Sequence, residues 1–181
     1  VTYPALSELS GNDREFGDGY ERIVRMLGFV IFPVMLGFVA IAEDMFMLLL
    51  GERWMPTVPY FEVLALSGLF YPLAVVAYNV LKVRSDGRVI VRLEVVKRVV
   101  MTVVLCFAIP RGVMAVAWGM TLMAGVEFLL NTIVAVRLAN VGALRLVRAL
   151  LPSFIIAVAM YFAIEVLNPY IAHLHIALRL L

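Results

Sequence analysis

Five apolar runs, each close to the length of a bilayer-spanning helix, limit how this chain can fold. They cover residues 26–42, 63–81, 89–109, 113–136 and 149–164. A helix that crosses the hydrocarbon core needs about 20 mostly apolar residues, with a range of about 17 to 25. The composition agrees, because 64% of the residues are hydrophobic and 15% are charged, against about 45–50% and about 25% in soluble domains. The sequence therefore predicts an integral membrane protein.

The predicted fold is an all-α, polytopic transmembrane helical bundle with about five spanning helices. Only helices and closed barrels satisfy every backbone N–H and C=O in lipid, and the runs lack the alternating segments of about 10 residues that mark barrel strands. Residues 1–21 are expected to form a cytoplasmic loop and helix start. The spanning helices are expected at 22–50, 60–81, 89–109, 113–138 and 145–166, followed by the truncated start of a further helix at 168–181.

The chain begins at Val1 and ends in an apolar run that stops before it could cross a membrane. We therefore expect it to be part of a longer polytopic protein. Pro33 and Pro72 lie inside predicted helices, where a missing N–H and a ring clash should kink the backbone. Transporters use such kinks as hinges, but neighbouring helices also accommodate proline without any movement.

The lysines and arginines alternate between the two sides of the predicted bundle. Twelve of the fifteen lie before the first run, between the second run and the middle of the third, or around the connection between the fourth and fifth runs. The remaining three stand one in each of the other connections or ends, at Arg53, Arg111 and Arg179. Basic residues near short loops are retained on the cytoplasmic side. This pattern predicts residues 1–21 in the cytoplasm and the Gly-Glu-Arg-Trp turn at 51–54 outside.

Three stretches carry a family resemblance: VTYPALSELS at 1–10, YERIVRMLGFVIFPVMLGFVAIAEDMFMLLLGERW at 20–54, and FEVLALSGLFYPLAVVAYNVLKVRSDGR at 61–88. With this proline, Leu-Ser and Gly-Glu-basic-Trp order, the chain resembles the Wzx-type polysaccharide and lipopolysaccharide flippases of the multidrug/oligosaccharidyl-lipid/polysaccharide exporter superfamily. The likeness covers about residues 1–90; beyond that, only hydropathy and loop spacing agree. One departure is the polar step at 82–88, which is longer than the Lys-Gly-Arg of many relatives.

The resemblance implies a two-lobed helical protein with a central cavity, of which this chain would be part of the C-terminal transmembrane lobe. It implies that the substrate is an oligosaccharide linked to a polyprenyl diphosphate. The protein would carry this lipid-linked substrate across the bacterial inner membrane by alternating access, for lipopolysaccharide or exopolysaccharide biosynthesis. It implies transport without an enzymatic reaction or a cofactor, and no nucleic-acid partner.

Two segments place ionisable groups inside predicted spanning helices, RLEVVKRVV at 92–100 and GVEFLLN at 125–131. A charged residue at mid-helix costs about 2.5 to 3.5 kcal/mol on insertion scales, so we expect the chemistry to reside there. Glu94 stands four residues before Arg98, the favourable order for a helical ion pair. One basic charge of the first segment is thus expected to be partly neutralised locally.

The short connection at 110–112 should make the third and fourth helices antiparallel neighbours. Lys97 and Arg98 lie about 13 or 14 residues before it and Glu127 about 16 after it, a mismatch of less than one helical turn. We hypothesise that Glu127 pairs with Arg98 or Lys97 across this hairpin. The pair would either fix helix packing alone or border a hydrated cavity and rearrange during transport.

A lipid-linked oligosaccharide carries a diphosphate, so its carrier needs cations that take this charge through a low-dielectric region, a task that suits arginine. The predicted substrate-binding residues are Arg92, Lys97, Arg98, Glu127 and Asn131. Arg22 and Arg25 are predicted to form a cytoplasmic vestibule. The alternative for Arg22, Arg25 and Arg88 is snorkelling, in which the long side chains reach the headgroups and anchor the helix.

Two other functions stay open: a membrane-embedded glycosyl transferase or polymerase acting on the same carrier, and a drug or ion antiporter of the same superfamily. No stretch resembles a nucleophile with its base, a phosphate-binding glycine loop or a zinc helix, which favours transport. His173 and His175 lie two residues apart, on different faces of a helix, and are not expected to bind a metal. Glu127 is a candidate protonation site that would couple export to a gradient of H⁺ or Na⁺.

Overall fold

The computed structural model describes the backbone of residues 11–179 and the side chains of residues 11–167. In this part of the chain every regular element is a helix, so the predicted all-α bundle is confirmed. The longer elements are α2 (Asp13–Ala40), α4 (Val58–Ser67), α5 (Tyr71–Arg84), α6 (Gly87–Ala108), α7 (Val113–Leu138) and α8 (Ala143–Arg179). They are supplemented by the short helix α3 (Ala42–Leu49) and the 3-10 helices η2 (Glu52–Thr57) and η3 (Ile109–Arg111).

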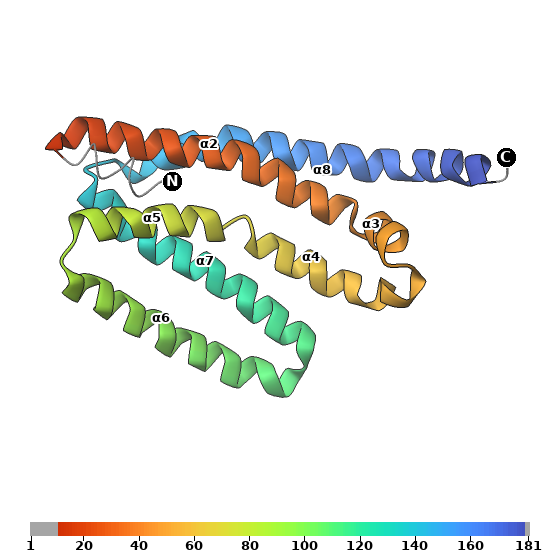
Figure 1. Ribbon diagram of the computed structural model, residues 1–181, viewed down its shortest axis with the longest axis horizontal. Coiled ribbons are helices and arrows are strands. Elements are labelled where there is room, and N and C mark those ends of the chain that lie inside the picture. The colour runs from red at the N-terminus through yellow and green to blue at the C-terminus, as the bar shows by residue number, and fades with distance from the viewer. Residues whose placement is uncertain (1–10, 180–181) are drawn as a thin grey trace.

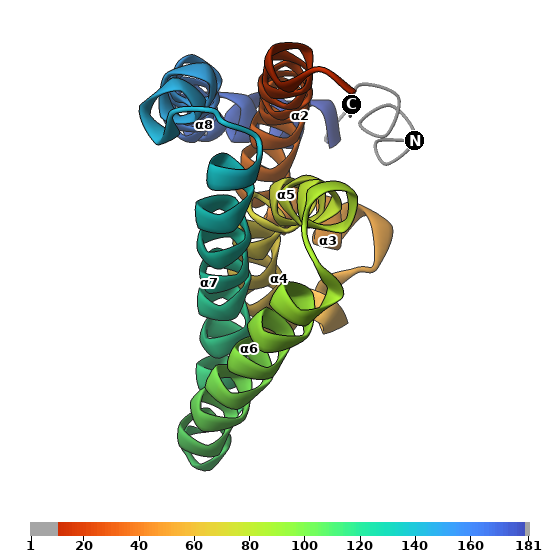
Figure 2. The same ribbon diagram turned by 90° about the vertical axis from the view of Figure 1, so that its left-hand side faces the viewer.

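The helices run back and forth along one common axis (Figure 1). α2, α6 and α8 run in one direction, whereas α7 and the consecutive helices α4 and α5 run in the other. Contacts join α2 to α8, α5 to α7, α4 to α7 and α6 to α7. Figure 2 shows the α2–α8 pair at one edge of the bundle and α6 at the opposite edge. We call the end at which α2, α6 and α8 begin the arginine-rich end.

Four segments of the described chain are long and apolar enough to cross a membrane: Asp13–Ala40, Glu52–Arg84, Val113–Leu138 and Ala143–Leu167. The chain is therefore a multi-pass membrane protein, as predicted. The fifth predicted span, 89–109, forms most of α6. This helix has 22 residues and a length of roughly 33 Å, but five of its first twelve residues are charged. Because of these charges α6 is not among the four segments that are apolar enough to cross a membrane, although α6 lies along α7 (Figures 1 and 2).

The stretch predicted as one helix at 60–81 contains a break at 68–70, between α4 and α5. The backbone amides of these three residues bond to carbonyls three positions earlier, at 3.0 to 3.2 Å, the spacing of a 3-10 turn. Pro72 follows in the first turn of α5, where a helix needs no amide donor. The proline thus begins a helix here, whereas Pro33 lies inside α2.

Other helix boundaries also differ from the predicted ones, and α2 begins at Asp13, before the predicted start at 22. The stretch 22–50 is divided at Ile41, so that α3 follows α2 as a separate short helix, and Gly51 turns the chain with a φ of +84°, which glycine adopts readily. At the other end, α8 continues without interruption through 168 to Arg179. Pro169 therefore lies inside a helix, as membrane helices tolerate. His173 and His175 lie outside the described side chains.

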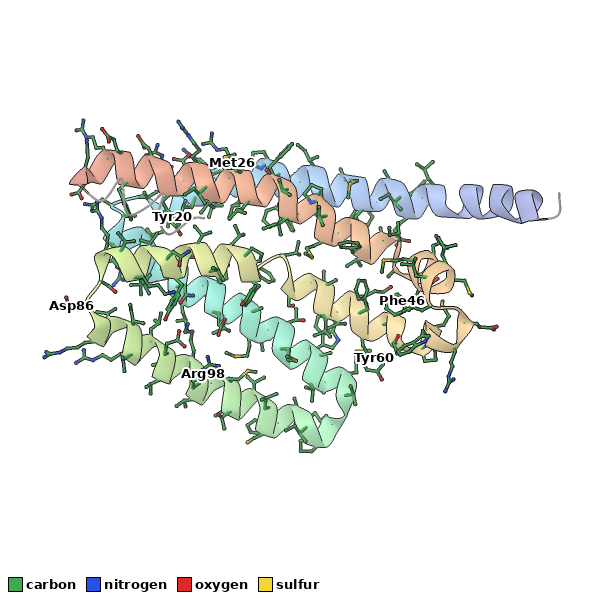
Figure 3. All side chains as sticks on the ribbon, in the orientation of Figure 1. Tyr20, Met26, Phe46, Tyr60, Asp86 and Arg98 are labelled. Carbon is green, nitrogen blue, oxygen red and sulfur yellow. The ribbon has the colours of Figure 1, made fainter. Side chains whose placement is uncertain are left out.

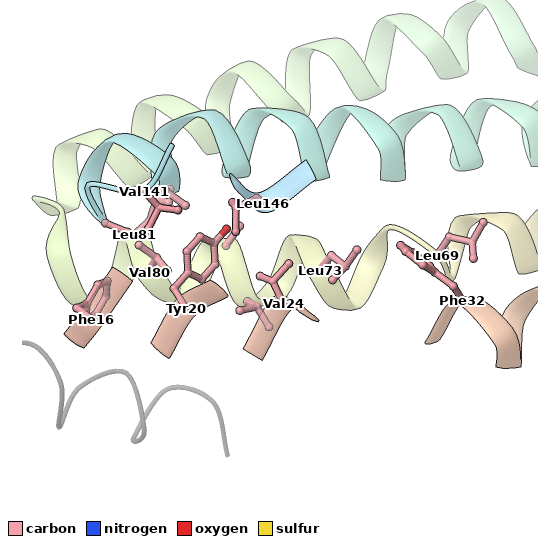
Figure 4. Close-up of a cluster of buried hydrophobic side chains, with 14 of the residues drawn as sticks. Phe16, Tyr20, Val24, Phe32, Leu69, Leu73, Val80, Leu81, Val141 and Leu146 are labelled. Atoms are coloured by element: carbon pink, nitrogen blue, oxygen red, sulfur yellow. The ribbon is translucent and has the colours of Figure 1, made fainter. Parts of the chain in front are cut away.

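The buried core lies between α2, α5, α7 and α8 near the arginine-rich end. Its α2 side chains include Phe16, Tyr20 and Val24, each at most 2% exposed. Figure 4 shows them beside the α5 side chains and those of the α7–α8 region; the labelled partners are Leu73, Val80, Leu81, Val141 and Leu146. This core fixes the pair α2 and α8 on the neighbouring helices α5 and α7.

α2 and α8 pack in parallel with a constant register. The ring centroids of Phe32 and Phe154 lie 5.6 Å apart, and a Cβ added at Gly28 would lie 2.6 Å from Cδ2 of Leu150. Both pairs are separated by the same number of positions along the chain, as parallel helices in one register require. The missing side chain of Gly28 therefore allows the close approach of the two helices.

Gly17 provides a test of this packing. A Cβ at this position would lie 2.9 Å from Cγ2 of Val141 and 3.0 Å from the carbonyl oxygen of Ala139, and a backbone atom cannot move away easily. We expect Gly17→Ala to lower the free energy of unfolding by about 1 to 3 kcal/mol, measured by thermal unfolding in detergent. Gly125→Ala is the matched control, because a Cβ there meets nothing within 4 Å. Equal melting temperatures for the two variants would contradict the packing described here.

Candidate functional site

Four of the five predicted substrate-binding residues line one cleft between α5, α6 and α7. Lys97 and Arg98 come from α6, and Glu127 and Asn131 come from α7. The cleft has a volume of about 420 Å³, and α5 supplies another wall that includes Tyr71 and Tyr78. Arg98 is labelled about midway along α6 in Figure 3. We call this space the central cleft.

Lys97 is the buried cation of the central cleft, with 4% of its surface exposed. Its ammonium forms an ion pair with Glu94, one turn earlier on α6, and donates a hydrogen bond of 3.5 Å to Oδ1 of Asn131 on α7. It also lies 5.1 Å from the centre of the Tyr78 ring on α5, within cation–π distance. A charge at this depth persists only with such partners. Lys97 therefore ties three helices together.

Asn131 is oriented by a second hydrogen bond. Its side chain is 3% exposed, and Nδ2 donates to the carbonyl oxygen of Ala74 on α5 at 3.2 Å. Because the amide nitrogen donates to α5, the amide group is oriented with its oxygen toward Lys97, from which it accepts a hydrogen bond. Nearer the N-terminus of α7, Thr121 donates to the carbonyl oxygen of Val63 on α4 at 2.7 Å. Polar bonds of this kind hold membrane helices together where the hydrophobic effect does not.

The hypothesised pair between Glu127 and Arg98 or Lys97 is not formed. Glu127 is half-buried and lines the central cleft, but within the described residues its carboxylate makes no ion pair within 4.0 Å. Both cations pair with Glu94 instead, Lys97 closely and Arg98 at 3.7 Å. The physical reason is proximity along one helix, because residues three and four apart lie on the same helix face.

Arg98 differs from Lys97 in exposure. Its side chain is 75% exposed, and its one ion pair to Glu94 is loose. The guanidinium has five N–H donors in a rigid fork, and most of them remain available at the mouth of the central cleft. Arg98 is thus the cation of this site that has most freedom to bind a ligand.

The other predicted site residues lie elsewhere. Arg92 is exposed on α6 and does not line the central cleft. Arg22 is exposed on α2. Arg25 forms an ion pair with Glu21 and lines a different cleft, between α2 and α8, that shares no residue with the central cleft. The expected vestibule is therefore not continuous with the central cleft in this structure.

Sequence reasoning missed the two tyrosines of α5. Tyr71 and Tyr78 are seven residues apart, which places both on one helix face, and both line the central cleft. Tyr78 also lies between two cations, with the ammonium of Lys82 at 4.8 Å from its ring centre and that of Lys97 at 5.1 Å. The spacing of seven was the signal in the sequence that points to a shared face.

The central cleft combines three kinds of polar group in a membrane-spanning bundle. Arg98 offers N–H donors for a phosphate, Glu127 accepts hydrogen bonds from hydroxyl groups, and the tyrosine hydroxyls do both. The formal charges of Glu94, Lys97, Arg98 and Glu127 cancel. Such a surface, with donors and acceptors and no net formal charge, suits a polar, hydroxyl-rich ligand.

Fold and site together define a multi-pass helical membrane protein with a polar cleft within its bundle. The family described as "Polysaccharide biosynthesis protein" matches residues 1–59. The predicted resemblance to Wzx-type polysaccharide flippases is confirmed by this match and by the relatives that follow, which are named for a membrane location or for the biosynthesis of teichuronic acid or lipopolysaccharide.

The chain is 26% identical over 132 residues to an uncharacterized membrane protein in the cps region of Klebsiella pneumoniae, an alignment that covers 72% of this chain and 27% of the relative. It is 28% identical over 69 residues to the teichuronic acid biosynthesis protein TuaB of Bacillus subtilis and 23% identical over 69 residues to the lipopolysaccharide biosynthesis protein WzxC of Escherichia coli. Each of these two alignments covers 38% of this chain and 14% of the relative.

The chain thus spans about a quarter or less of the length of these curated relatives. No solved structure matches it significantly.

Removing one partner of the Lys97–Glu94 pair tests its structural role. Glu94→Gln leaves the buried ammonium of Lys97 without its carboxylate, and we expect the free energy of unfolding to fall by about 3 kcal/mol. This value is the lower end of the range for a broken buried pair, because the Glu94 side chain is 31% exposed. The double variant Glu94→Gln/Lys97→Met should recover most of this stability, since an apolar side chain of similar volume replaces the charge. Thermal unfolding in detergent measures both.

Glu127→Gln is the matched control, since Glu127 lines the same cleft and makes no ion pair with a described side chain. If Glu94→Gln melts at the same temperature as this control, the pair does not stabilise the bundle.

Proposed function

We propose that this protein works as a flippase that carries an oligosaccharide linked to a polyprenyl diphosphate across the bacterial inner membrane by alternating access. The observation that carries the proposal is the central cleft, which collects Lys97, Arg98, Glu127 and Asn131 inside a membrane-spanning bundle. The likeness to proteins named for teichuronic acid and lipopolysaccharide biosynthesis supports a glycan as the cargo. Because the chain covers a small part of these relatives, transport would be an activity of the full-length protein.

The charges of the central cleft support a diphosphate ligand. Lys97 is neutralised by Glu94 and bound to Asn131, so it holds the wall of the cleft in place. Arg98 keeps an exposed guanidinium, which can bind two phosphate oxygens at once. We assign Arg98 to the diphosphate, and Glu127 and the α5 tyrosines to the hydroxyl groups of the sugars.

The break between α4 and α5 supports a hinge. A 3-10 stretch within a longer helix is a common site of functional bending, and Tyr71 of the central cleft follows the break at 68–70 directly. Rotation of α5 about this point would change the side of the membrane to which the central cleft opens. In this proposal Pro72 defines where the moving helix begins.

Glu127 supports coupling to an ion gradient. It is a half-buried carboxylate of the central cleft without an ion pair among the described side chains, so it is free to bind H⁺ or Na⁺. Binding of the ion would remove a negative charge next to the diphosphate position. We therefore propose Glu127 as the group that links ion movement to substrate release.

The role of Arg98 is tested by export in cells that carry the full-length protein. Arg98→Gln should lower export by about tenfold or more, the loss expected for a hydrogen bond to a charged group, and Lys97→Gln/Arg98→Gln should abolish it. Membrane insertion of Arg98→Gln should not change, because Arg98 is exposed. Arg92→Gln is the control on the same helix outside the cleft and should export normally. Normal export by the double variant would refute the substrate role.

The coupling role of Glu127 is tested in liposomes that hold the purified full-length protein and a lipid-linked oligosaccharide. Glu127→Gln is expected to abolish the response of transport to an imposed H⁺ or Na⁺ gradient. Glu52→Gln, at an exposed position in η2, should respond as the unmodified protein does. An unchanged response of Glu127→Gln would contradict the assignment.

The same liposomes separate transport from synthesis. A flippase moves the substrate without changing its glycan, whereas a glycosyl transferase or polymerase lengthens or releases it. Release or lengthening of the sugar chain by the purified protein would replace the flippase by an enzyme.

A further inference from the structure

A second cleft, of about 510 Å³, lies between α2 and α8 near the arginine-rich end. Its charged lining consists of Glu21 and Arg25 from α2 and of Arg145 and Arg148 from α8. Its apolar lining includes Met26 and Phe29 of α2. We call this space the basic cleft. The proposed flippase function does not use it.

The basic cleft lies where both helices change from polar to apolar. On α2 the last charged residue before the apolar run is Arg25, and on α8 it is Arg148. The two helices are parallel and in register, as the contact between Gly28 and Leu150 shows, so both changes occur at the same level. In a membrane protein this level is the boundary between headgroups and hydrocarbon. The positive-inside pattern places this boundary on the cytoplasmic side.

The arginines of the basic cleft are held in place but not saturated. Glu21, which is 6% exposed, forms ion pairs with Arg25 and with Arg145, so one carboxylate positions a guanidinium on each wall. Arg145 also pairs with Asp18 at 2.8 Å. Each guanidinium has five N–H donors, more than these contacts use.

Arg148 makes no ion pair or hydrogen bond with any side chain in the described part of the chain. Its guanidinium therefore adds an unneutralised charge to the α8 wall of the cleft. The three arginines and the one lining carboxylate leave the cleft with an excess of positive charge.

We propose that the basic cleft is a binding site for the phosphodiester headgroup of an anionic membrane phospholipid. Arg148 and the remaining donors of Arg25 and Arg145 would bind the phosphate oxygens, since arginine forks match this geometry. The acyl chains would lie along Met26 and Phe29. Basic pockets between membrane helices on the cytoplasmic side are suited to anionic headgroups.

The position of the cleft favours a lipid over a soluble anion. Met26 and Phe29 are each 64% exposed, and α2 and α8 form an edge of the bundle in Figure 2. The cleft thus combines cations at one level with an exposed apolar surface at the next, which matches the two parts of a phospholipid. A free phosphate would gain nothing from the apolar half.

Native mass spectrometry of the full-length protein, titrated with phosphatidylglycerol, tests the proposal. Arg148→Ala should weaken phosphatidylglycerol binding about fivefold, the effect of one basic residue on an anionic lipid. Binding of zwitterionic phosphatidylcholine should change less, because its choline cation offsets the charge of the phosphate. Arg148→Lys keeps the charge and should retain most of the affinity. Because Arg148 is exposed and unpaired among the described side chains, these variants should melt as the unmodified protein does.

Arg22→Ala is the matched control, because Arg22 is exposed on α2 near the same end but does not line the basic cleft. It should leave phosphatidylglycerol affinity unchanged. Equal affinity of Arg148→Ala and the unmodified protein overturns the site, as does an equal loss in Arg22→Ala. Displacement of phosphatidylglycerol by inorganic phosphate at comparable concentration would show a free-anion site and overturn the lipid assignment.

Discussion

The bilayer offers no water to the backbone, and the rest of this structure depends on that constraint. Every N–H and C=O in the hydrocarbon region must find its partner within the protein, and in runs of this length a helix provides all of these partners within one segment. The constraint explains why the chain runs back and forth along one axis (Figure 1). It also explains why the break at 68–70 replaces helical bonds with 3-10 bonds that keep the three amides satisfied.

The same constraint gives polar side chains their role. The burial of Lys97 is tolerated because Glu94, Asn131 and the Tyr78 ring surround its ammonium. Asn131 accepts the hydrogen bond from Lys97 through Oδ1, because its Nδ2 donates to the carbonyl oxygen of Ala74. A network of this kind specifies which helices meet and at what height. The same residues line the central cleft. Structure and proposed transport thus share one set of residues.

Much of the fold was predictable from the sequence, because the length of an apolar run indicates directly whether it can cross a membrane as a helix. Residue counting along the hairpin also indicated that Lys97, Arg98 and Glu127 lie at similar depth. Counting gives no information about helix rotation, and this is why it paired Glu127 with a cation that Glu94 takes instead. The separation of Arg25 from the central cleft was hidden for the same reason, since it depends on α2 packing against α8. The break before Pro72 depends on local hydrogen bonding that hydropathy does not register.

The arrangement of the helices across the membrane is the claim that everything else requires, and cysteine accessibility tests it most directly. In a cysteine-free form of the full-length protein, Asp86→Cys would report on the connection between α5 and α6, and Glu52→Cys on the turn after α3. Figure 3 labels Asp86 at one end of the bundle, opposite the end marked by Phe46 and Tyr60. A membrane-impermeant maleimide added to intact cells should label Glu52→Cys and leave Asp86→Cys unlabelled until the cytoplasmic side is opened. Labelling of both positions from the same side would contradict the account.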